Sequence, residues 1–367
     1  MIQGIAFLIA GLFPLGFLLA VKSFDFYQTG SSKFIIYSGV WGIIAYLLAA
    51  RINPALVDHD IVSLDTVLRY VAPLLEEILK GLILIYLIRH PDFKYFLDGA
   101  IYGFAAGIGF AIFENFEYIL GHPSTALVLA ISRVLSTNLI HATGSALIGI
   151  ALGLARFNRS ALLRALYLLG GLTLAIAIHS GFNNMVNDRV ALGFAFLAGL
   201  GGAGVIAAAA RRGFKDEKSW VDTNIRSTQG VTSGEASVVQ RLNEVDILLA
   251  PLAKRFGEQK AAQSREFLFM QARLAIQGKM LKKMQDEKMR AAIRVQILEL
   301  DQKMNELRKA VGAYCMLYVR SIYPASDTQL WSLLQQRSVA NKSEAGTGVW
   351  MKLDKRLKPK PAVGEQD

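Results

Sequence analysis

The stretch APLLEEILKG, residues 72–81, places Glu76, Glu77 and Lys80 within two helical turns of an otherwise apolar segment. Charged side chains are costly inside a lipid bilayer, and an ionisable residue there is a functional-site hypothesis by default. Glu76 precedes Lys80 by four residues, the favourable order for an ion pair along a helix. Glu77 lies about 100° around the helix from Glu76, so we expect only one of the two glutamates to face water directly.

The composition indicates a membrane protein with a basic soluble part. The chain has 367 residues, of which 53% are hydrophobic. Residues 1–210 hold 12 Lys/Arg and 11 Asp/Glu, whereas residues 211–367 hold 28 and 18. Such a basic excess is typical of a segment on the cytoplasmic side of a membrane, and since no nucleic-acid motif accompanies it we expect no nucleic acid. Cys315 is the one cysteine, which excludes an intramolecular disulfide and a Cys-x-x-Cys metal site.

Seven apolar stretches are long enough to approach the roughly 20 residues that a membrane-spanning helix needs. They lie near residues 3–21, 34–50, 67–88, 98–120, 133–154, 162–187 and 190–210. We therefore predict an all-α fold, a polytopic membrane helix bundle of about seven transmembrane helices with a C-terminal cytoplasmic helical domain.

The positive charges of the loops predict the orientation in the cell membrane, because Lys and Arg favour the cytoplasmic side. Arg51 and Arg189 are the Lys/Arg residues of one set of loops. The other set is much richer and contains Lys22, Lys33, Arg89, Lys94, Arg156, Arg159, Arg164, Arg211, Arg212 and Lys215. We expect the N-terminus outside and the C-terminal domain in the cytoplasm.

The chain divides into four predicted parts. Residues 1–210 form the transmembrane core, and residues 211–236 form a linker that is rich in Ser, Thr and Gly. Residues 237–325 carry apolar residues at three- and four-residue spacing, which predicts a helical hairpin or short coiled coil. We expect this domain to bind a cytoplasmic partner or to self-associate. Residues 326–367 are predicted to be a flexible tail.

Polar residues recur inside the later apolar segments. They are Glu114, Asn115 and Glu117 in FAIFENFEY, His141 in STNLIHATGS, and His179 and Asn183 in IAIHSGFNNM. Counted from the outer end of each segment, Glu76, Glu114, His141 and His179 all lie roughly 9–14 Å deep at a rise of 1.5 Å per residue. We interpret Glu117 as facing the outer interface and Arg133 as snorkelling near the outer boundary.

The shared depth favours a catalytic site over isolated structural residues. A Glu–Lys pair alone can join two helices, and a lone histidine is more often a packed core residue than a ligand, but neither reading explains one common level. Two carboxylates in different environments can divide acid and base work. Two histidines can be metal ligands or can stabilise an oxyanion. Two rival functions remain: a proton-coupled transporter or channel, and a membrane scaffold that acts through its cytoplasmic helices.

Four motifs in order resemble the PrsW family of intramembrane proteases, relatives of the type II CAAX prenyl proteases and bacteriocin-processing enzymes. Glu76-Glu77-x-x-Lys80 matches an EExxK motif, and Phe110-x-x-x-Glu114-Asn115 matches FxxxEN. His141 matches the third motif, and His179-x-x-x-Asn183 matches the fourth. The resemblance covers about residues 65–190.

The resemblance implies an intramembrane endopeptidase that hydrolyses a membrane-associated protein, such as a single-span anti-sigma factor, in a site-1-type step. It implies a water activated by Glu76 or Glu77, with Lys80 as charge partner and Asn115 in support. His179 and Asn183 would stabilise the oxyanion. We expect His141 to help position the water or a metal ion and Glu114 to assist proton transfer, although Glu114 stands where the CAAX relatives carry a histidine. A zinc set of Glu114, His141 and His179 and a metal-free glutamate mechanism both stay open.

Overall fold

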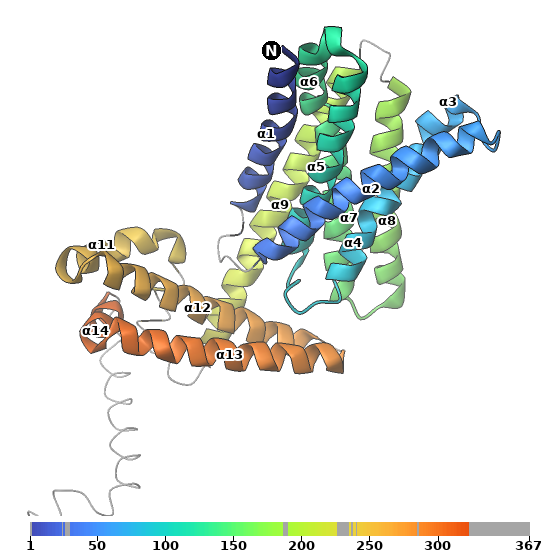
Figure 1. The fold of residues 1–367 in the computed structure, drawn as a ribbon. Coiled ribbons are helices and arrows are strands. Elements are labelled where there is room, and N and C mark those ends of the chain that lie inside the picture. Colours follow the sequence, from blue (N-terminus) through green and yellow to red (C-terminus); the bar gives the residue numbers. More distant parts are fainter. Residues whose placement is uncertain are drawn as a thin grey trace, which may run out of the picture.

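The computed structural model describes residues 2–23, 25, 30–185, 190–225, 235, 238–239, 241–284 and 286–322, and every regular element within them is helical. The membrane part comprises α1 (Ile2–Lys22), α2 (Ser32–Asp58), α3 (Leu64–Thr66), a π-helical turn (Val67–Val71), α4 (Ala72–Leu87), α5 (Phe96–Gly121), a 3-10 turn (Pro123–Thr125), α6 (Ala126–Leu135), α7 (Thr137–Arg156), α8 (Ala161–Met185) and α9 (Ala191–Ile225). Figure 1 shows these helices as one bundle with α2 crossing it obliquely.

The predicted all-α polytopic bundle is confirmed. Five helical stretches are long and apolar enough to cross a membrane: Ile2–Lys22, Ser32–Asp58, Phe96–Gly121, Pro123–Arg156 and Ala161–Met185. The third and seventh predicted segments correspond to shorter helices, the 16-residue α4 and the apolar stretch Gly193–Ala209 of α9. The protein is therefore a multi-pass membrane protein.

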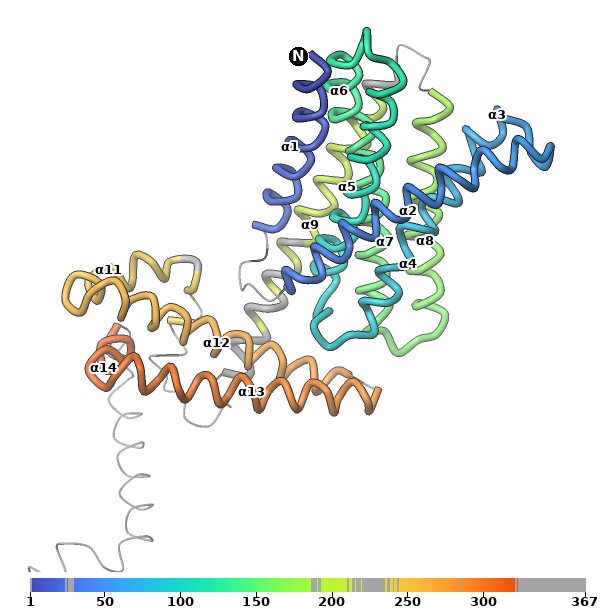
Figure 2. Tube along the Cα trace, in the orientation of Figure 1, coloured from blue at the N-terminus to red at the C-terminus, as the bar shows by residue number. Residues whose placement is uncertain are grey.

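The fifth predicted segment is broken in the structure. Sequence patterning starts it at Arg133, but the chain enters as α6, turns at Ser136 and restarts as α7 at Thr137. Ser136 lies outside the helical region with φ −123° and ψ −81°. The break allows α6 to pack against α1, as Figures 1 and 2 show, while α7 packs against α5 and α8.

Helix α5 lies at the centre of the bundle, since every residue from Phe96 to Ala111 is buried. It meets α7 through its glycines. A Cβ at Gly99 would clash with the backbone of Gly149, and a Cβ at Gly103 would clash with the backbone of Ser145. Small residues at four-residue spacing therefore bring the two helix backbones into direct contact.

Two helices at the edge of the bundle contribute one narrow face each. In α8 only Ala175, His179 and Phe182 are buried among the described positions, and their spacing of four and three residues forms a single stripe. In α4 the buried face carries all three charged residues, whereas Leu74, Ile78, Leu82 and Ile85 are 40–45% exposed. The charges of APLLEEILKG therefore point away from lipid.

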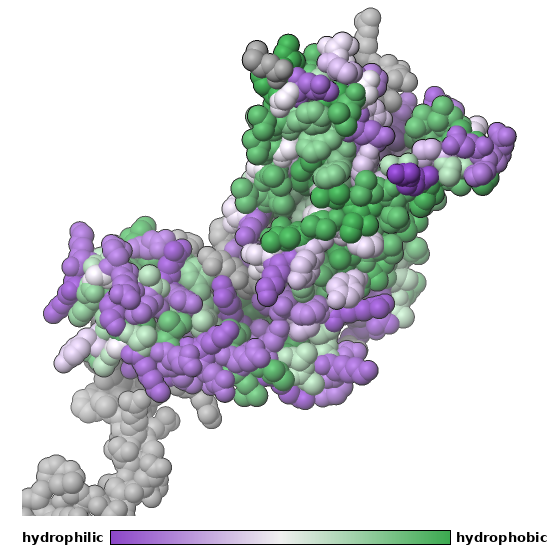
Figure 3. Space-filling view, viewed as in Figure 1, coloured by the Kyte–Doolittle hydropathy of each residue, from purple (hydrophilic) through white to green (hydrophobic). Residues whose placement is uncertain are grey.

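The C-terminal helices form a separate layer at one end of the bundle (Figure 1). They are a 3-10 turn (Leu242–Glu244), α11 (Val245–Phe256), α12 (Glu258–Lys283), α13 (Glu287–Val311) and α14 (Ala313–Ser321). Helices α12 and α13 pack as a hairpin, and the Asp286 carboxylate caps α13 by accepting a hydrogen bond from the Met289 N–H. Figure 3 shows the contrast between the apolar bundle and this hydrophilic layer.

The layer is attached to the bundle by contacts as well as by the chain. One apolar cluster contains Phe93 and Leu152 of the bundle and Phe267 of α12. The Gln296 side-chain amide of α13 donates a 2.6 Å hydrogen bond to Asp92, in the loop between α4 and α5. Helix α9 continues to Ile225, through the first part of the predicted linker. The predicted flexible tail, residues 326–367, lies outside the described residues.

Replacing Gly103 by alanine should lower the thermal stability of the protein in detergent. The added methyl group would push α5 away from α7, and overpacking of this kind costs about 1–3 kcal/mol. Gly201 of α9 is the matched control, because a Cβ there meets nothing within 4 Å. Differential scanning fluorimetry of Gly103→Ala and Gly201→Ala checks this, and an equal melting temperature for both variants would contradict direct backbone packing.

Candidate active site

The buried face of α4 brings a lysine between a glutamate and a histidine. Lys80 Nζ lies 2.6 Å from Glu77 Oε1 and 2.8 Å from His141 Nδ1, and all three side chains are fully buried. An ammonium group only donates hydrogen bonds, so His141 Nδ1 must be the acceptor. A neutral His141 therefore carries its proton on Nε2, which lies 3.0 Å from Glu114 Oε2 and donates to it.

Glu77 also fixes the second histidine. His179 Nδ1 lies 3.0 Å from the same Oε1 atom of Glu77, which as a carboxylate oxygen accepts the Nδ1 proton. In neutral His179 this leaves the Nε2 lone pair free, and Nε2 lies 3.8 Å from Glu76 Oε2. The two imidazole rings meet edge to face, with centroids 4.7 Å apart.

Glu76 is the glutamate that faces the open cleft. The cleft has a volume of about 750 Å³, and its walls include Glu76, Glu114, Arg133, His179 and Asn183 but not Glu77. Glu76 Oε1 accepts a 3.3 Å hydrogen bond from the Asn53 amide, whereas Glu76 Oε2 is buried without a hydrogen-bond partner. An unpaired buried carboxylate oxygen beside a free histidine nitrogen leaves a polar gap in which a small polar species would satisfy both.

The expectation that one glutamate faces water therefore agrees with the structure. Glu77 does not line the cleft, and Lys80 pairs with Glu77 and not with Glu76, the partner that the four-residue spacing predicts. The four residues of common predicted depth also come together, since Glu76, His141 and His179 each have a ligand atom within 4.8 Å of the others and Glu114 bonds to His141.

Arg133 points into the site and does not snorkel. Its side chain is 12% exposed, and its Nη2 atom lies 2.6 Å from Glu114 Oε2. Its Nε atom donates a 2.7 Å hydrogen bond to Asn115, whose own amide donates to Asn138. The outward interpretation was wrong because it took Arg133 as the start of a continuous span, whereas α6 ends just after this residue at the break.

Pro73 explains a second group of polar contacts at the cleft. Proline has no N–H for the Arg69 carbonyl four residues earlier. The Ala72 N–H bonds to Val67 in the π-helical turn, so it does not serve the Leu68 carbonyl. The Asn183 amide donates to Leu68 at 2.8 Å, and the Ser180 hydroxyl donates to Arg69 at 2.5 Å. Side chains of α8 thus satisfy the freed carbonyls of the π-helical turn, as membrane helices require.

Several residues of the cleft escaped sequence reasoning. Asn53 of α2 reaches Glu76, and the Tyr46 hydroxyl of the same helix donates to Glu117, which is exposed as expected. Sequence patterning had no means of bringing α2 to these glutamates, because its polar residues lie outside the four motifs. The contact of Ser180 could have been predicted in part, because Pro73 in APLLEEILKG leaves a backbone carbonyl in need of another donor.

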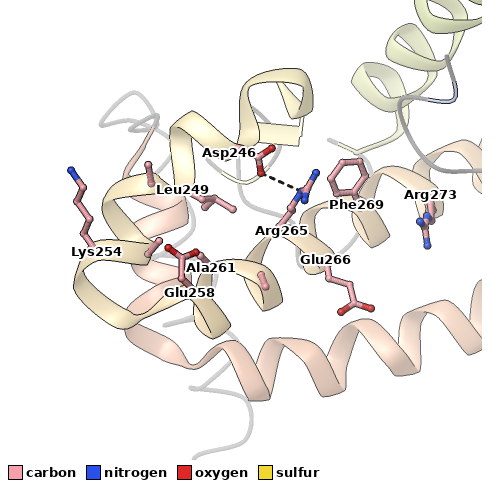
Figure 4. Close-up of a pocket in the computed structure, with 12 residues that line it drawn as sticks. Asp246, Leu249, Lys254, Glu258, Ala261, Arg265, Glu266, Phe269 and Arg273 are labelled. Carbon is pink, nitrogen blue, oxygen red and sulfur yellow. Dashed lines mark ion pairs between the residues drawn. The ribbon is translucent and has the colours of Figure 1, made fainter. Parts of the chain in front are cut away.

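A second cavity lies in the C-terminal layer, far along the chain from these residues. It has a volume of about 670 Å³ and lies between α11 and α12. Figure 4 shows Asp246 and Arg265 facing each other across it, with an ion-pair distance of 3.4 Å, and Leu249 and Phe269 as apolar lining. Its lining contains neither histidine nor cysteine, so it lacks the chemistry of the membrane site.

Comparison with known proteins connects the membrane site to one family. Residues 31–210 match the family described as PrsW family intramembrane metalloprotease. Protease PrsW of Bacillus subtilis (strain 168) is 39% identical over 85 residues, which are 23% of this chain and 38% of that protein. Protease PrsW of Geobacillus kaustophilus (strain HTA426) is 27% identical over 135 residues, 36% of this chain and 59% of that protein. No solved structure matches this chain.

The fold and the site define a multi-pass helical membrane protein with a buried glutamate–histidine centre. Residues 31–210 of this chain resemble the PrsW family of intramembrane proteases. It spans less than two thirds of the length of either relative.

The family description implies a metal ion, and the buried Glu76, His141 and His179 are residue types that bind one. Glu114, expected in this set, is instead ion-paired with Arg133. Glu76 Oε2 and His179 Nε2 fit two ligand positions, since His179 donates its other N–H to a carboxylate as ligating histidines do. His141 does not fit, because Nδ1 accepts from Lys80 and Nε2 carries the proton. The hydrogen bonds therefore leave two free ligands, whereas a catalytic zinc site takes three from the protein.

Removing the Ser180 hydroxyl should destabilise the protein through the orphaned carbonyl of Arg69. Within a membrane a carbonyl that loses its partner is costly, because hydrocarbon offers no replacement donor. Pro73→Ala restores an N–H that the turn can use, so Ser180→Ala should cost less in that background. A double-mutant cycle of thermal unfolding in detergent measures this coupling. Additive effects of the two substitutions would show that Pro73 does not create the need for Ser180.

Proposed function

We propose that this protein is an intramembrane endopeptidase that hydrolyses a peptide bond of a membrane-associated protein. The observation that carries the proposal is the pairing of Glu76 Oε2, buried without a partner, with the His179 Nε2 lone pair 3.8 Å away at a cleft. A water molecule between two such acceptors is held and polarised by both. The match of residues 31–210 to the PrsW family supports the same reaction.

In this mechanism Glu76 is the general base. It takes a proton from the water as the water oxygen bonds to the scissile carbonyl carbon, and it gives that proton to the leaving amine as the C–N bond breaks. Glu77 does not meet the substrate. It holds the His179 N–H and receives charge compensation from Lys80, so that His179 presents the correct nitrogen.

The developing oxyanion needs a hydrogen-bond donor in the same cleft. Asn183 lines the cleft and donates one amide N–H to Leu68, which leaves its second N–H for a substrate oxygen. We assign this role to Asn183. Lys80 and Glu114 have a different role, which is to hold His141 in place. Both nitrogens of His141 are occupied by hydrogen bonds to Lys80 and Glu114, so the proposed mechanism uses no metal ion.

The proposed substrate is a membrane protein with a single span, such as an anti-sigma factor, cut in a site-1-type step. The cleft is lined by Gly121 and Asn184, at the ends of α5 and α8 remote from the C-terminal layer. With the basic C-terminal layer in the cytoplasm by the positive-inside rule, the cleft opens on the outer side. The C-terminal helices, with their groove between α11 and α12, offer a surface for a cytoplasmic partner or for self-association.

Glu76→Gln should reduce cleavage of a single-span reporter in detergent or liposomes by at least about 100-fold, the usual contribution of a general base. Asp58→Asn is the matched control, because Asp58 is an exposed carboxylate at the end of α2. Mass spectrometry of the products should place the cut near the outer end of the reporter span. A Glu76→Gln protein that cleaves as fast as the parent would sink the assignment.

Cleavage should survive removal of metal ions. The purified protein is treated with a chelator, its zinc content is measured by mass spectrometry, and cleavage is compared before treatment, after it and after zinc is added back. We expect equal rates in all three samples, because His141 offers no free nitrogen to an ion. Activity that is lost with the metal and restored by zinc would show that His141 rearranges and that the metal-free mechanism is wrong.

A further inference from the structure

We propose that Arg133 is a positioning residue of this site, which holds Glu114 so that His141 and Lys80 keep the catalytic pair in register. The proposal rests on the proposed function. Arg133 lies outside all four sequence motifs, and its contacts alone single it out.

Arg133 is held on three sides by the last turns of α5. Its Nη2 atom lies 2.6 Å from Glu114 Oε2, and its Nε atom donates to Asn115 at 2.7 Å. Its guanidinium carbon lies 3.8 Å from the centroid of the Tyr118 ring, a cation–π contact. A planar guanidinium group with several donors suits such a site, whereas a lysine ammonium group could not reproduce all of these contacts.

Glu114 Oε2 has two partners, since it accepts the N–H of His141 and forms an ion pair with the Arg133 guanidinium group. Without Arg133, Glu114 would be a largely buried carboxylate without its countercharge, in the same cleft as Glu76. A buried charge that loses its partner is strongly destabilised, so Glu114 would move or take up a proton. In either case His141 would lose the acceptor that fixes its Nε2 proton.

The effect reaches the catalytic pair through four more contacts. His141 Nδ1 accepts from Lys80, and Lys80 donates to Glu77. Glu77 in turn accepts from His179, whose free nitrogen faces Glu76. Positive, negative and neutral groups alternate along this path, and its hydrogen bonds fix the proton positions of His141 and His179. Arg133 lies at one end of this path. It belongs to α6 and contacts residues of α5, so it attaches the path to both helices.

Steady-state cleavage of the reporter by Arg133→Ala, Arg133→Lys and Arg51→Ala tests the proposal. We expect Arg133→Ala to lower kcat on the order of 10- to 100-fold with little change in KM, because displacement of a catalytic group by about 1 Å slows the reaction to this extent. Arg133→Lys keeps the charge beside Glu114 and should recover part of kcat. Arg51, an exposed arginine of α2, is the charge-matched control and should leave kcat unchanged.

A second readout does not depend on activity. In protein with nitrogen-15-labelled histidine, the Nε2–H resonance of His141 is identified by its loss in His141→Asn. We expect this resonance to shift or to disappear by exchange in Arg133→Ala and to stay in place in Arg51→Ala. An unchanged resonance together with an unchanged kcat would overturn the role of Arg133.

The two proposals can fail separately. A parent protein without Glu76-dependent cleavage overturns the proposed function, while the resonance still shows whether Arg133 controls His141. Glu76-dependent cleavage that is equally fast in Arg133→Ala overturns the positioning role alone. A rise in KM without a fall in kcat would also overturn the positioning role, because Arg133 would then contact the substrate.

Discussion

The Lys80 ammonium group, buried between Glu77 and His141, is the interaction on which the site depends. Because an ammonium group cannot accept a hydrogen bond, it decides the proton positions of both neighbours at once. It directs the His141 proton to Nε2 and supplies the countercharge for a carboxylate that must hold His179. A buried charge without such compensation would be too costly inside a membrane protein. The lysine thus makes the cluster of buried polar groups possible.

The fold serves this cluster by bringing four helices close at one depth. Glycines remove side-chain volume between α5 and α7, so His141 of α7 comes within reach of Glu114 of α5. The narrow buried faces of α4 and α8 then add Glu77 and His179 from the edge of the bundle. Most of the apolar surface of α8 stays exposed, so a helix with few buried residues still brings His179 to the cluster.

Sequence reasoning predicted the part of this arrangement that follows from periodicity and depth. The helical bundle, the inward face of α4 and the meeting of Glu76, Glu114, His141 and His179 follow from counting residues along apolar helices. Arg133 and Asn53 could not be predicted that way, because their direction depends on the break at Ser136 and on the oblique path of α2. Those features are set by packing between segments distant in sequence. The division of labour between Glu76 and Glu77 likewise required the positions of their neighbours.

The π-helical turn before α4 has a consequence for the register of the glutamates. A π-helical turn holds one residue more than the α-helical turn it replaces, so it shifts the angular phase of everything on one side of it relative to the other. Val67–Val71 therefore sets the rotation of α4 relative to α3, the short helix before it. Ser180 and Asn183 of α8 stabilise this turn by hydrogen bonds to its carbonyl groups. The helix that carries His179 therefore also contacts the turn that sets the rotation of Glu76, so one packing contact aligns both residues of the proposed catalytic pair.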